Sequence, residues 1–359
     1  MAFLIYLSIM KRLNTTLTIL LSLIISAGLS AQIKPRITIL ATGGTIAGTA
    51  LSATQASYTP GVISIDEIIS SVPGIKSLSE LTGIQVCNIS SQNMTPQIWL
   101  RLYSIIDSLF VNNISDGVVI THGTDTMEET AYFLNLTVKH SKPVVLTGSM
   151  RPSSSLSPDG PFNLYNAVAL ASSPDAAGKG VMVVMNDYIF SADDVTKTHT
   201  VNTDAFSCPN LGPLGYMRGG KPVFSRESGN RHTIKSEFKM SGISSLPKVE
   251  IVYGYAFSSG IALEALIDSG VEGVVIAGVG HGNYNREYAN EMERGYNRGV
   301  RFVRSARILR GGVDKSAEEF DSKHPVAGMK TPQKARILLM LALTKTSYSK
   351  EIQRMFDQY

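Results

Sequence analysis

Residues 37–48, ITILATGGTIAG, combine an apolar run with a glycine turn that follows it directly. The run from Ile37 to Ala41 is β-branched or aliphatic throughout, which is typical of a strand buried on both faces of a sheet. The two glycines of the turn allow backbone N–H groups to come close to a ligand at the end of that strand. The stretch therefore predicts a buried parallel strand with a ligand-binding loop at its carboxyl end.

The same kind of apolar run recurs along the chain and alternates with stretches of helical periodicity. Strand-like runs occupy residues 85–89, 117–120, 144–146, 181–184, 249–253, 273–276 and 299–303, and helical stretches occupy 98–109, 125–138, 163–171, 332–344 and 350–356. In the second helix we expect Asp125 to act as the N-cap and Glu128 to reach back to it as a capping box. The alternation predicts an α/β fold with a parallel sheet and right-handed crossovers.

The length of 359 residues is enough for two domains with separate cores. Residues 225–246 lose the apolar pattern and read as a linker. We predict a larger N-terminal catalytic domain over residues 32–224, with a mainly parallel sheet flanked by helices, and a smaller C-terminal α/β domain over residues 247–359.

The composition narrows the class of protein. A hydrophobic fraction of 43% excludes a disordered chain. The formal net charge is only +4 and the sequence has no basic tract, so a nucleic-acid partner is disfavoured and a small molecule is the expected partner.

Residues 1–31 have the layout of a secretory signal peptide. Lys11 and Arg12 precede an apolar run over residues 17–25, and small residues lead to a cleavage site after Ala31. Met10 is the expected start of translation, since it stands directly before the basic pair. A retained membrane anchor is the alternative, which the short apolar run disfavours. We expect a protein of the periplasm or the medium, without membrane contact after cleavage.

The cysteine and histidine content argues against a disulfide framework and a metal site. Cys87 and Cys208 are the only cysteines, and two buried free thiols are favoured over a disulfide between them. The six histidines have no spacing typical of metal ligands.

Three predicted strands end in loops rich in glycine and hydroxyl residues, with the sequences TGGTIAG (42–48), THGTD (121–125) and TGSMRP (147–152). Ligands of open parallel sheets bind beyond the carboxyl ends of the strands, so these loops are the expected site. The first loop is not a nucleotide motif: Thr49 stands where a P-loop needs its lysine, and the glycine spacing differs from GxGxxG. A glycine turn that merely allows close packing is the structural alternative.

The first two loops, extended to HGTDTMEE (122–129), resemble the two signature segments of bacterial L-asparaginases, and the leader points to the exported type II branch. The resemblance covers nearly all of the chain after the leader and continues in KPVV (142–145), MRP (150–152), DGPFNLYNA (159–167), DVTKT (194–198) and PQKAR (332–336). It implies an enzyme without a cofactor that hydrolyses L-asparagine to L-aspartate and ammonia through a threonyl acyl-enzyme.

The resemblance also implies a set of catalytic residues. Thr45 falls on the nucleophile, and Thr124, Asp125 and Lys197 fall on a set in which the lysine can draw a proton from a hydroxyl. Tyr58 falls on the tyrosine of a loop, residues 48–61, that closes over the substrate, and it could either activate Thr45 or shield it from water. Which base serves each step stays open.

Substrate-binding positions follow in the same way. Ser91 and Gln92 match a pair that binds the α-carboxylate, Asp125 would also bind the α-ammonium, and Thr124 and the Ser149 backbone are expected oxyanion donors. Asn283 and Glu318 match residues that a neighbouring subunit contributes, with Glu319 as an alternative to Glu318. The resemblance therefore implies a homotetramer with shared active sites.

Two other functions stay open at this point. A glutaminase-asparaginase differs in accepting one additional methylene, which is worth only about 1–3 kcal/mol of discrimination. A periplasmic amino-acid-binding protein would share two α/β domains and a leader, but it has no need of a nucleophile.

Overall fold

The computed structural model describes residues 1–28, 34–49, 63–315 and 319–359. Within these ranges the chain forms two compact units, Met1–Lys34 and Pro35–Tyr359. The first unit contains helix α1, Ala2–Gly28, which covers most of the predicted leader. Among the helices of the described ranges, none is both long and apolar enough to cross a membrane.

The larger sheet of the second unit has strand order β10-β9-β6-β5-β4-β3-β1-β2. Strands β2, β1, β3, β4 and β5 run parallel, and β6, β9 and β10 continue the sheet in antiparallel fashion. The strands span β1 Arg36–Gly43, β2 Glu80–Ile89, β3 Gly117–Thr121, β4 Val144–Thr147, β5 Val181–Met185, β6 Tyr188–Ser191, β9 Gly215–Arg218 and β10 Lys221–Phe224. Each predicted strand of this region is therefore present.

Helices cover both faces of this sheet. In β3, Val118 and Ile120 pack into the core that contains α4 and α5, whereas Val119 packs into the core that contains α6, because successive side chains of a strand point to opposite faces. The helices and 3₁₀ turns around the sheet are η1 Thr45–Ala47, α2 Ile65–Ser70, α3 Ile75–Leu78, η2 Ser91–Asn93, α4 Pro96–Val111, α5 Met127–Thr137, α6 Gly160–Ala171 and η3 Pro174–Ala176.

The capping prediction for α5 is wrong. The N-cap of α5 is Thr126 and makes no side-chain capping hydrogen bond. The Asp125 carboxylate instead accepts a hydrogen bond from the Lys197 Nζ, 72 residues away in the sequence. The Glu128 carboxylate accepts one from the Lys197 backbone N–H, 69 residues away. Contacts with a residue distant in the sequence thus take the place of the predicted local capping box.

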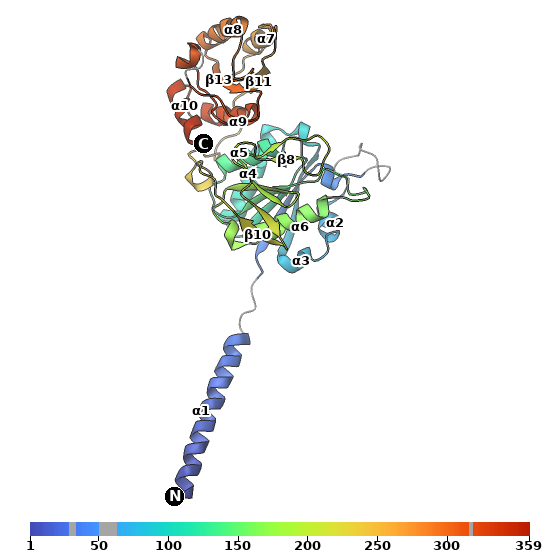
Figure 1. Cartoon of the computed structure of the whole chain (residues 1–359). Coiled ribbons are helices and arrows are strands. Elements are labelled where there is room, and N and C mark those ends of the chain that lie inside the picture. The colour runs from blue at the N-terminus through green and yellow to red at the C-terminus, as the bar shows by residue number, and fades with distance from the viewer. Residues whose placement is uncertain (29–33, 50–62, 316–318) are drawn as a thin grey trace. The chain divides into compact units, whose positions relative to one another are not determined.

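A smaller parallel sheet in the order β11-β12-β13 follows, with the strands at Val249–Tyr253, Gly273–Gly278 and Arg301–Ala306. Helices α7 (Ile261–Asp268) and α8 (Arg286–Asn297) pack on one face, and α9 (Pro332–Leu343) packs on the other, where it also contacts α5 (Figure 1). The helix α10, Ser349–Gln358, lies against α9. The prediction of a larger mainly parallel domain and a smaller α/β domain is confirmed.

The chain forms little regular structure between β6 and β9 and again between β10 and β11. The hairpin of β7 (Thr196–Lys197) and β8 (Phe206–Ser207) precedes β9, and the segment 225–246 contains only η4, Thr233–Lys235. Phe238 and Met240 of this segment are buried in the core shared with α5 and α9. The predicted linker is therefore packed onto the body of the protein, and the exact domain boundaries stay a prediction. The last 3₁₀ turn of the chain, η5, spans Glu319–Ser322.

Candidate active site

The loops after β1, β2 and β3 meet at the carboxyl edge of the large sheet through glycines. Gly44 has a φ of +79°, and a Cβ atom there would lie 2.5 Å from the Gly123 backbone. A Cβ atom at Gly123 would in turn lie 2.8 Å from the side chain of Ser91. Since β1 lies between β2 and β3 in the sheet, the chain reverses its direction of strand addition here, which is where ligands of open α/β sheets bind.

Thr45 is the first residue of η1 and is buried directly behind this glycine turn. Gly43 and Gly44 both have positive φ, which residues with a side chain rarely adopt. The Gly44 N–H donates to the Ile89 carbonyl at the end of β2, over 3.0 Å. The position of Thr45 therefore depends on the positive φ angles of Gly43 and Gly44, which residues with a side chain rarely adopt.

Lys197, Thr124 and Asp125 form a hydrogen-bonded set beside that turn. The Lys197 Nζ donates to Thr124 Oγ1 over 2.9 Å and to Asp125 Oδ1 over 2.7 Å. Thr124 is buried, whereas the Asp125 side chain is 57% exposed. The structure thus brings the three predicted residues together, with the carboxylate at the open side where a soluble ammonium group can reach it.

Ser91 and Gln92 lie in η2, after β2. Ser91 is buried, and its Oγ accepts a hydrogen bond of 3.2 Å from the Asp125 N–H. Its carbonyl accepts from the Thr126 hydroxyl over 2.7 Å, so Ser91 holds the loop that carries Thr124 and Asp125. Gln92 is exposed.

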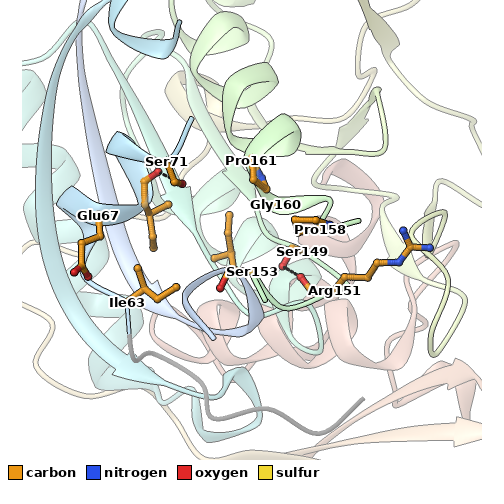
Figure 2. A pocket seen from close by; sticks show the side chains of 11 residues that line it. Ile63, Glu67, Ser71, Ser149, Arg151, Ser153, Pro158, Gly160 and Pro161 are labelled. Atoms are coloured by element: carbon orange, nitrogen blue, oxygen red, sulfur yellow. Dashed lines mark hydrogen bonds between the residues drawn. The ribbon is translucent and has the colours of Figure 1, made fainter. Parts of the chain in front are cut away.

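Ser149 lies after β4, and its buried hydroxyl donates to the Arg151 carbonyl over 2.8 Å. Figure 2 shows this contact at the edge of a small cavity of about 80 Å³, lined by η1, α2 and the loop after β4. The cavity takes in Ile46, the neighbour of Thr45, and its lining is mainly apolar. The Ser149 hydroxyl is therefore engaged with the backbone of its own loop.

The remaining predicted residues are not joined to this set in the described structure. Asn283 is exposed in the loop after β12, and the hydrogen bonds described for it pair its backbone with Val279. Tyr58 and Glu318 lie outside the described residues. The backbone of Glu319 begins η5.

A buried chain of hydrogen bonds that the sequence analysis missed supports the Thr124 loop. The His122 Nδ1 lies 2.7 Å from the Gly123 carbonyl, which can only accept, so this nitrogen carries the hydrogen. The His122 Nε2 then accepts from Thr130, whose hydroxyl accepts from the Trp99 indole N–H; both distances are 2.8 Å. Burial lowers the pKa of His122 to about 4, so the ring is neutral at neutral pH. The sequence feature that could have drawn attention to His122 is its position directly before Gly123 in the HGTD loop.

The remaining candidate groups are the two cysteines and the side chains that could bind a metal ion. Both cysteines are free; Cys208 is buried and Cys87 is half-buried. Burial raises the pKa of Cys208 to about 12, so this thiol stays protonated. Within the ranges that the structure covers, no three histidine, cysteine or carboxylate side chains are grouped closely enough to hold a metal ion.

Two family descriptions match nearly the whole second unit. "Asparaginase, N-terminal" matches residues 36–229, and "Glutaminase/Asparaginase C-terminal domain" matches residues 248–356. The first range carries the Thr45 loop and the Lys197 set, and the second carries Asn283.

Full-length relatives agree with this match. The chain is 46% identical to L-asparaginase 2 of Escherichia coli (strain K12), over 95% of this chain and 98% of that protein. It is 45% identical to a probable periplasmic L-asparaginase of Haemophilus influenzae, over 98% and 100% of the two chains. It is also 46% identical to a glutaminase-asparaginase of Pseudomonas fluorescens biotype A, over 90% of each.

A crystal structure of a probable cytoplasmic L-asparaginase from Campylobacter jejuni superposes with a TM-score of 0.87 at 49% identity, covering 91% of this chain and all of that one. Sequence and fold thus lead to the same conclusion. The chain belongs to the asparaginase family.

Proposed function

We propose that the protein is an exported L-asparaginase that hydrolyses L-asparagine to L-aspartate and ammonia through an acyl-enzyme on Thr45. The observation that carries the proposal is the hydrogen-bonded set of Lys197, Thr124 and Asp125 beside the Gly43–Gly44 turn, in a chain of the asparaginase family. A buried hydroxyl, an amine and a carboxylate at one sheet edge are the parts that amide hydrolysis needs.

In the first half-reaction the Thr45 hydroxyl oxygen attacks the side-chain carboxamide carbon of asparagine. The hydroxyl proton passes to the base, the C–N bond breaks, and ammonia leaves with a proton, which gives an ester between Thr45 and the β-carboxyl group. Thr124 Oγ1 and the N–H of Ser149 would stabilise the negative charge on the carbonyl oxygen. In the second half-reaction water attacks this ester, and aspartate leaves as Thr45 regains its proton.

The acid–base group in this proposal is Lys197. Its Nζ donates to both Thr124 Oγ1 and Asp125 Oδ1. The α-ammonium of the substrate would compete with Lys197 for the Asp125 carboxylate, and loss of that contact would leave the Lys197 Nζ available to the Thr45 hydroxyl. Substrate binding would thereby switch on the base.

The substrate would be held by charge complementarity. Asp125 is the exposed carboxylate for the α-ammonium, and Ser91 and Gln92 supply neutral donors for the α-carboxylate. Neutral donors fix the anion without introducing a cation that would pair with Asp125. Tyr58 would cover the bound substrate from the loop that contains it.

Asn283 and Glu318 would complete the site of a neighbouring subunit in a homotetramer. The support from this chain is that Asn283 is exposed and that its described hydrogen bonds do not reach the Lys197 set. A site shared in this way makes activity depend on assembly.

Export is part of the proposal. The basic pair Lys11–Arg12 and the apolar run after it lie in the separate unit Met1–Lys34, and a relative of 45% identity is named as periplasmic. The solved relative from Campylobacter jejuni is named as cytoplasmic, so the location of this protein has to be tested on the protein itself. We expect the protein in a periplasmic extract to have lost the residues up to Ala31, as read from its mass and N-terminal sequence.

A glutaminase-asparaginase is the second candidate, because a relative of 46% identity bears that name. Both candidates share the chemistry and differ in the fit of one methylene, worth about 1–3 kcal/mol. Steady-state ammonia release from asparagine and from glutamine separates them. A kcat/KM at least about tenfold higher for asparagine supports the narrower function, and equal values support the broader one.

The same assay tests the proposal as a whole. Purified protein without the leader should release ammonia from asparagine, and a Thr45→Ala variant should not do so at a comparable rate. A parent protein that binds asparagine without releasing ammonia would instead favour an amino-acid-binding protein.

A further inference from the structure

Two buried charged side chains hold the backbone that carries Lys197. The Lys197 N–H donates to Glu128 Oε2 over 2.7 Å. Two residues earlier, the Val195 carbonyl accepts from the Lys334 Nζ. The segment 195–197, which includes β7, is thus held by the Glu128 carboxylate of α5 and the Lys334 Nζ of α9.

Both side chains are almost fully withdrawn from water, with exposures of 5% for Glu128 and 1% for Lys334. Burying an ionised group is unfavourable unless it is paired and hydrogen-bonded. Shorter polar or apolar residues could fill these positions at a lower desolvation cost. Two buried charged side chains that bind the backbone of one three-residue segment, 195–197, indicate that the position of this segment matters as well as its stability.

Glu128 precedes the Lys197 segment in the sequence, and Lys334 follows it. Glu128 stands in the first turn of α5, directly after the loop of Thr124 and Asp125, so one carboxylate ties Lys197 to the two groups that its Nζ contacts. Lys334 stands in α9, which packs between the small sheet and α5. The C-terminal part of the chain therefore contacts the Lys197 segment through the Lys334 side chain.

We infer that Glu128 and Lys334 are positioning residues for Lys197, and that they act by fixing the backbone from which its side chain reaches Thr124 and Asp125. The inference rests on the proposed function, in which Lys197 handles the proton of the reaction. A lysine side chain has four rotatable bonds, so its Nζ is placed to within hydrogen-bond tolerance only if its Cα is fixed. A misplacement of 1 Å in such a group can lower the rate by about 10²-fold.

Substitutions at Glu128 distinguish the effect of its hydrogen bond to the Lys197 N–H from the effect of filling a buried position. Glu128→Gln keeps an oxygen that can accept from the Lys197 N–H, and Glu128→Ala removes it. We expect kcat for asparagine to fall by about 10- to 100-fold in Glu128→Ala, with KM nearly unchanged, and to stay within about threefold of the parent in Glu128→Gln. The neighbouring half-buried carboxylate Glu129 ion-pairs with Arg336 at 3.6 Å rather than with the Lys197 segment, so Glu129→Ala is the matched control.

Substitutions at Lys334 test the second contact. Lys334→Met keeps the length of the side chain and removes the donor to Val195. Lys330 is the matched control, since it is a second well-packed lysine that donates to a backbone carbonyl, that of Phe356 over 2.8 Å, away from Lys197. Lys334→Met and Lys330→Met should both unfold at a lower temperature than the parent. Only Lys334→Met should have a lower kcat, by about tenfold.

A double-mutant cycle with Lys197→Met decides whether the two residues act through the lysine. If they do, Glu128→Ala and Lys334→Met cause no further loss of kcat once Lys197 is methionine. The inference is overturned if their effects multiply with that of Lys197→Met, or if Glu129→Ala and Lys330→Met lose as much kcat. A parent that releases no ammonia refutes the proposed function instead, and that result is read before any variant is compared.

Discussion

The side-chain nitrogen of Lys197 lies 2.9 Å from the hydroxyl oxygen of Thr124, although 73 residues separate them in the sequence. The contact joins a strand-end loop of the large parallel sheet to the β7–β8 hairpin. It is therefore formed only when the sheet, the hairpin and the helices that hold them are all in place.

Replacing the proposed nucleophile should abolish turnover and preserve the fold. Thr45→Ala removes the hydroxyl, so kcat for asparagine should fall by about 10³-fold or more. Thr45→Ser keeps the hydroxyl and loses the methyl group that restricts χ1, so its kcat should lie between those of the parent and Thr45→Ala. Steady-state ammonia release and thermal unfolding measure the two effects. A fully active Thr45→Ala would contradict the assignment.

Replacing the proposed base should affect chemistry more than binding. In Lys197→Met we expect kcat to fall by about 10²- to 10⁴-fold, with asparagine still bound. Lys197→Arg should not restore activity, because a guanidinium stays protonated and cannot accept a proton. Calorimetric binding of asparagine beside steady-state kinetics gives both quantities. An active arginine variant would show that only the positive charge matters.

The glycine turn can be tested by adding one methyl group. Gly44→Ala should lower both stability and kcat, because the new Cβ would meet the Gly123 backbone at 2.5 Å and the residue would have to keep a φ of +79°. Gly74→Ala is the control, since Gly74 has a φ of +74° with no atom within 4 Å of the new Cβ. We expect Gly74→Ala to cost only about 1–2 kcal/mol of unfolding free energy, from the left-handed conformation, and to leave kcat unchanged. Equal behaviour of the two variants would refute the close contact between the loops.

The strands, the glycine loops and the approximate positions of helices α4, α5, α6, α9 and α10 follow from local patterns, so they could be predicted from the sequence. The run at residues 37–41 and the turn after it predicted β1 and the glycines of positive φ at its end. Helix α4 begins at Pro96 after the N-cap Thr95, two residues before the predicted helical stretch. These features depend on neighbours in the chain.

The roles of Asp125, Glu128 and Lys334 depend on partners 60 to 140 residues away and could not be read locally. Asp125 and Glu128 have the spacing of a capping box, and this local signal gave the wrong partner for both carboxylates. Lys334 has the sequence context of an ordinary helix start, and its ammonium is buried only because α9 packs against α5. Tertiary contacts decided these cases.

Acid should destabilise the protein through its buried histidines. Burial lowers the pKa of His324 to about 4, against 6.5 in the unfolded chain. Between these values only the unfolded chain binds the proton, so the stability that His324 contributes is present above pH 6.5 and is lost as the pH falls toward 4, at about 1.4 kcal/mol per pH unit. His324→Leu should reduce the slope of unfolding free energy against pH by that amount. Denaturant unfolding at pH 4.5 to 7.5 measures it, and an unchanged slope would contradict the shift.

Sharing of the active site between subunits predicts complementation. Thr45→Ala and Asn283→Ala are each expected to be defective alone. If Asn283 serves the neighbouring site, a mixed assembly contains some sites with both residues intact, and about a quarter of the parent activity should return after random reassembly of equal amounts. If Asn283 serves its own site, every site of the mixture lacks one residue and no activity returns. Ammonia release after denaturation and joint refolding distinguishes the two cases.

The most direct test of the account is to identify the residue that becomes acylated. The protein is mixed with a slowly hydrolysed asparagine analogue, quenched in acid during turnover and digested, and the modified peptide is sequenced by mass spectrometry. The account predicts one aspartyl ester, on the Thr45 hydroxyl, that disappears when the analogue is exhausted and is absent from Thr45→Ala. An ester on another side chain, or turnover without any acylated species in a sample whose quench preserves a reference ester, would contradict it.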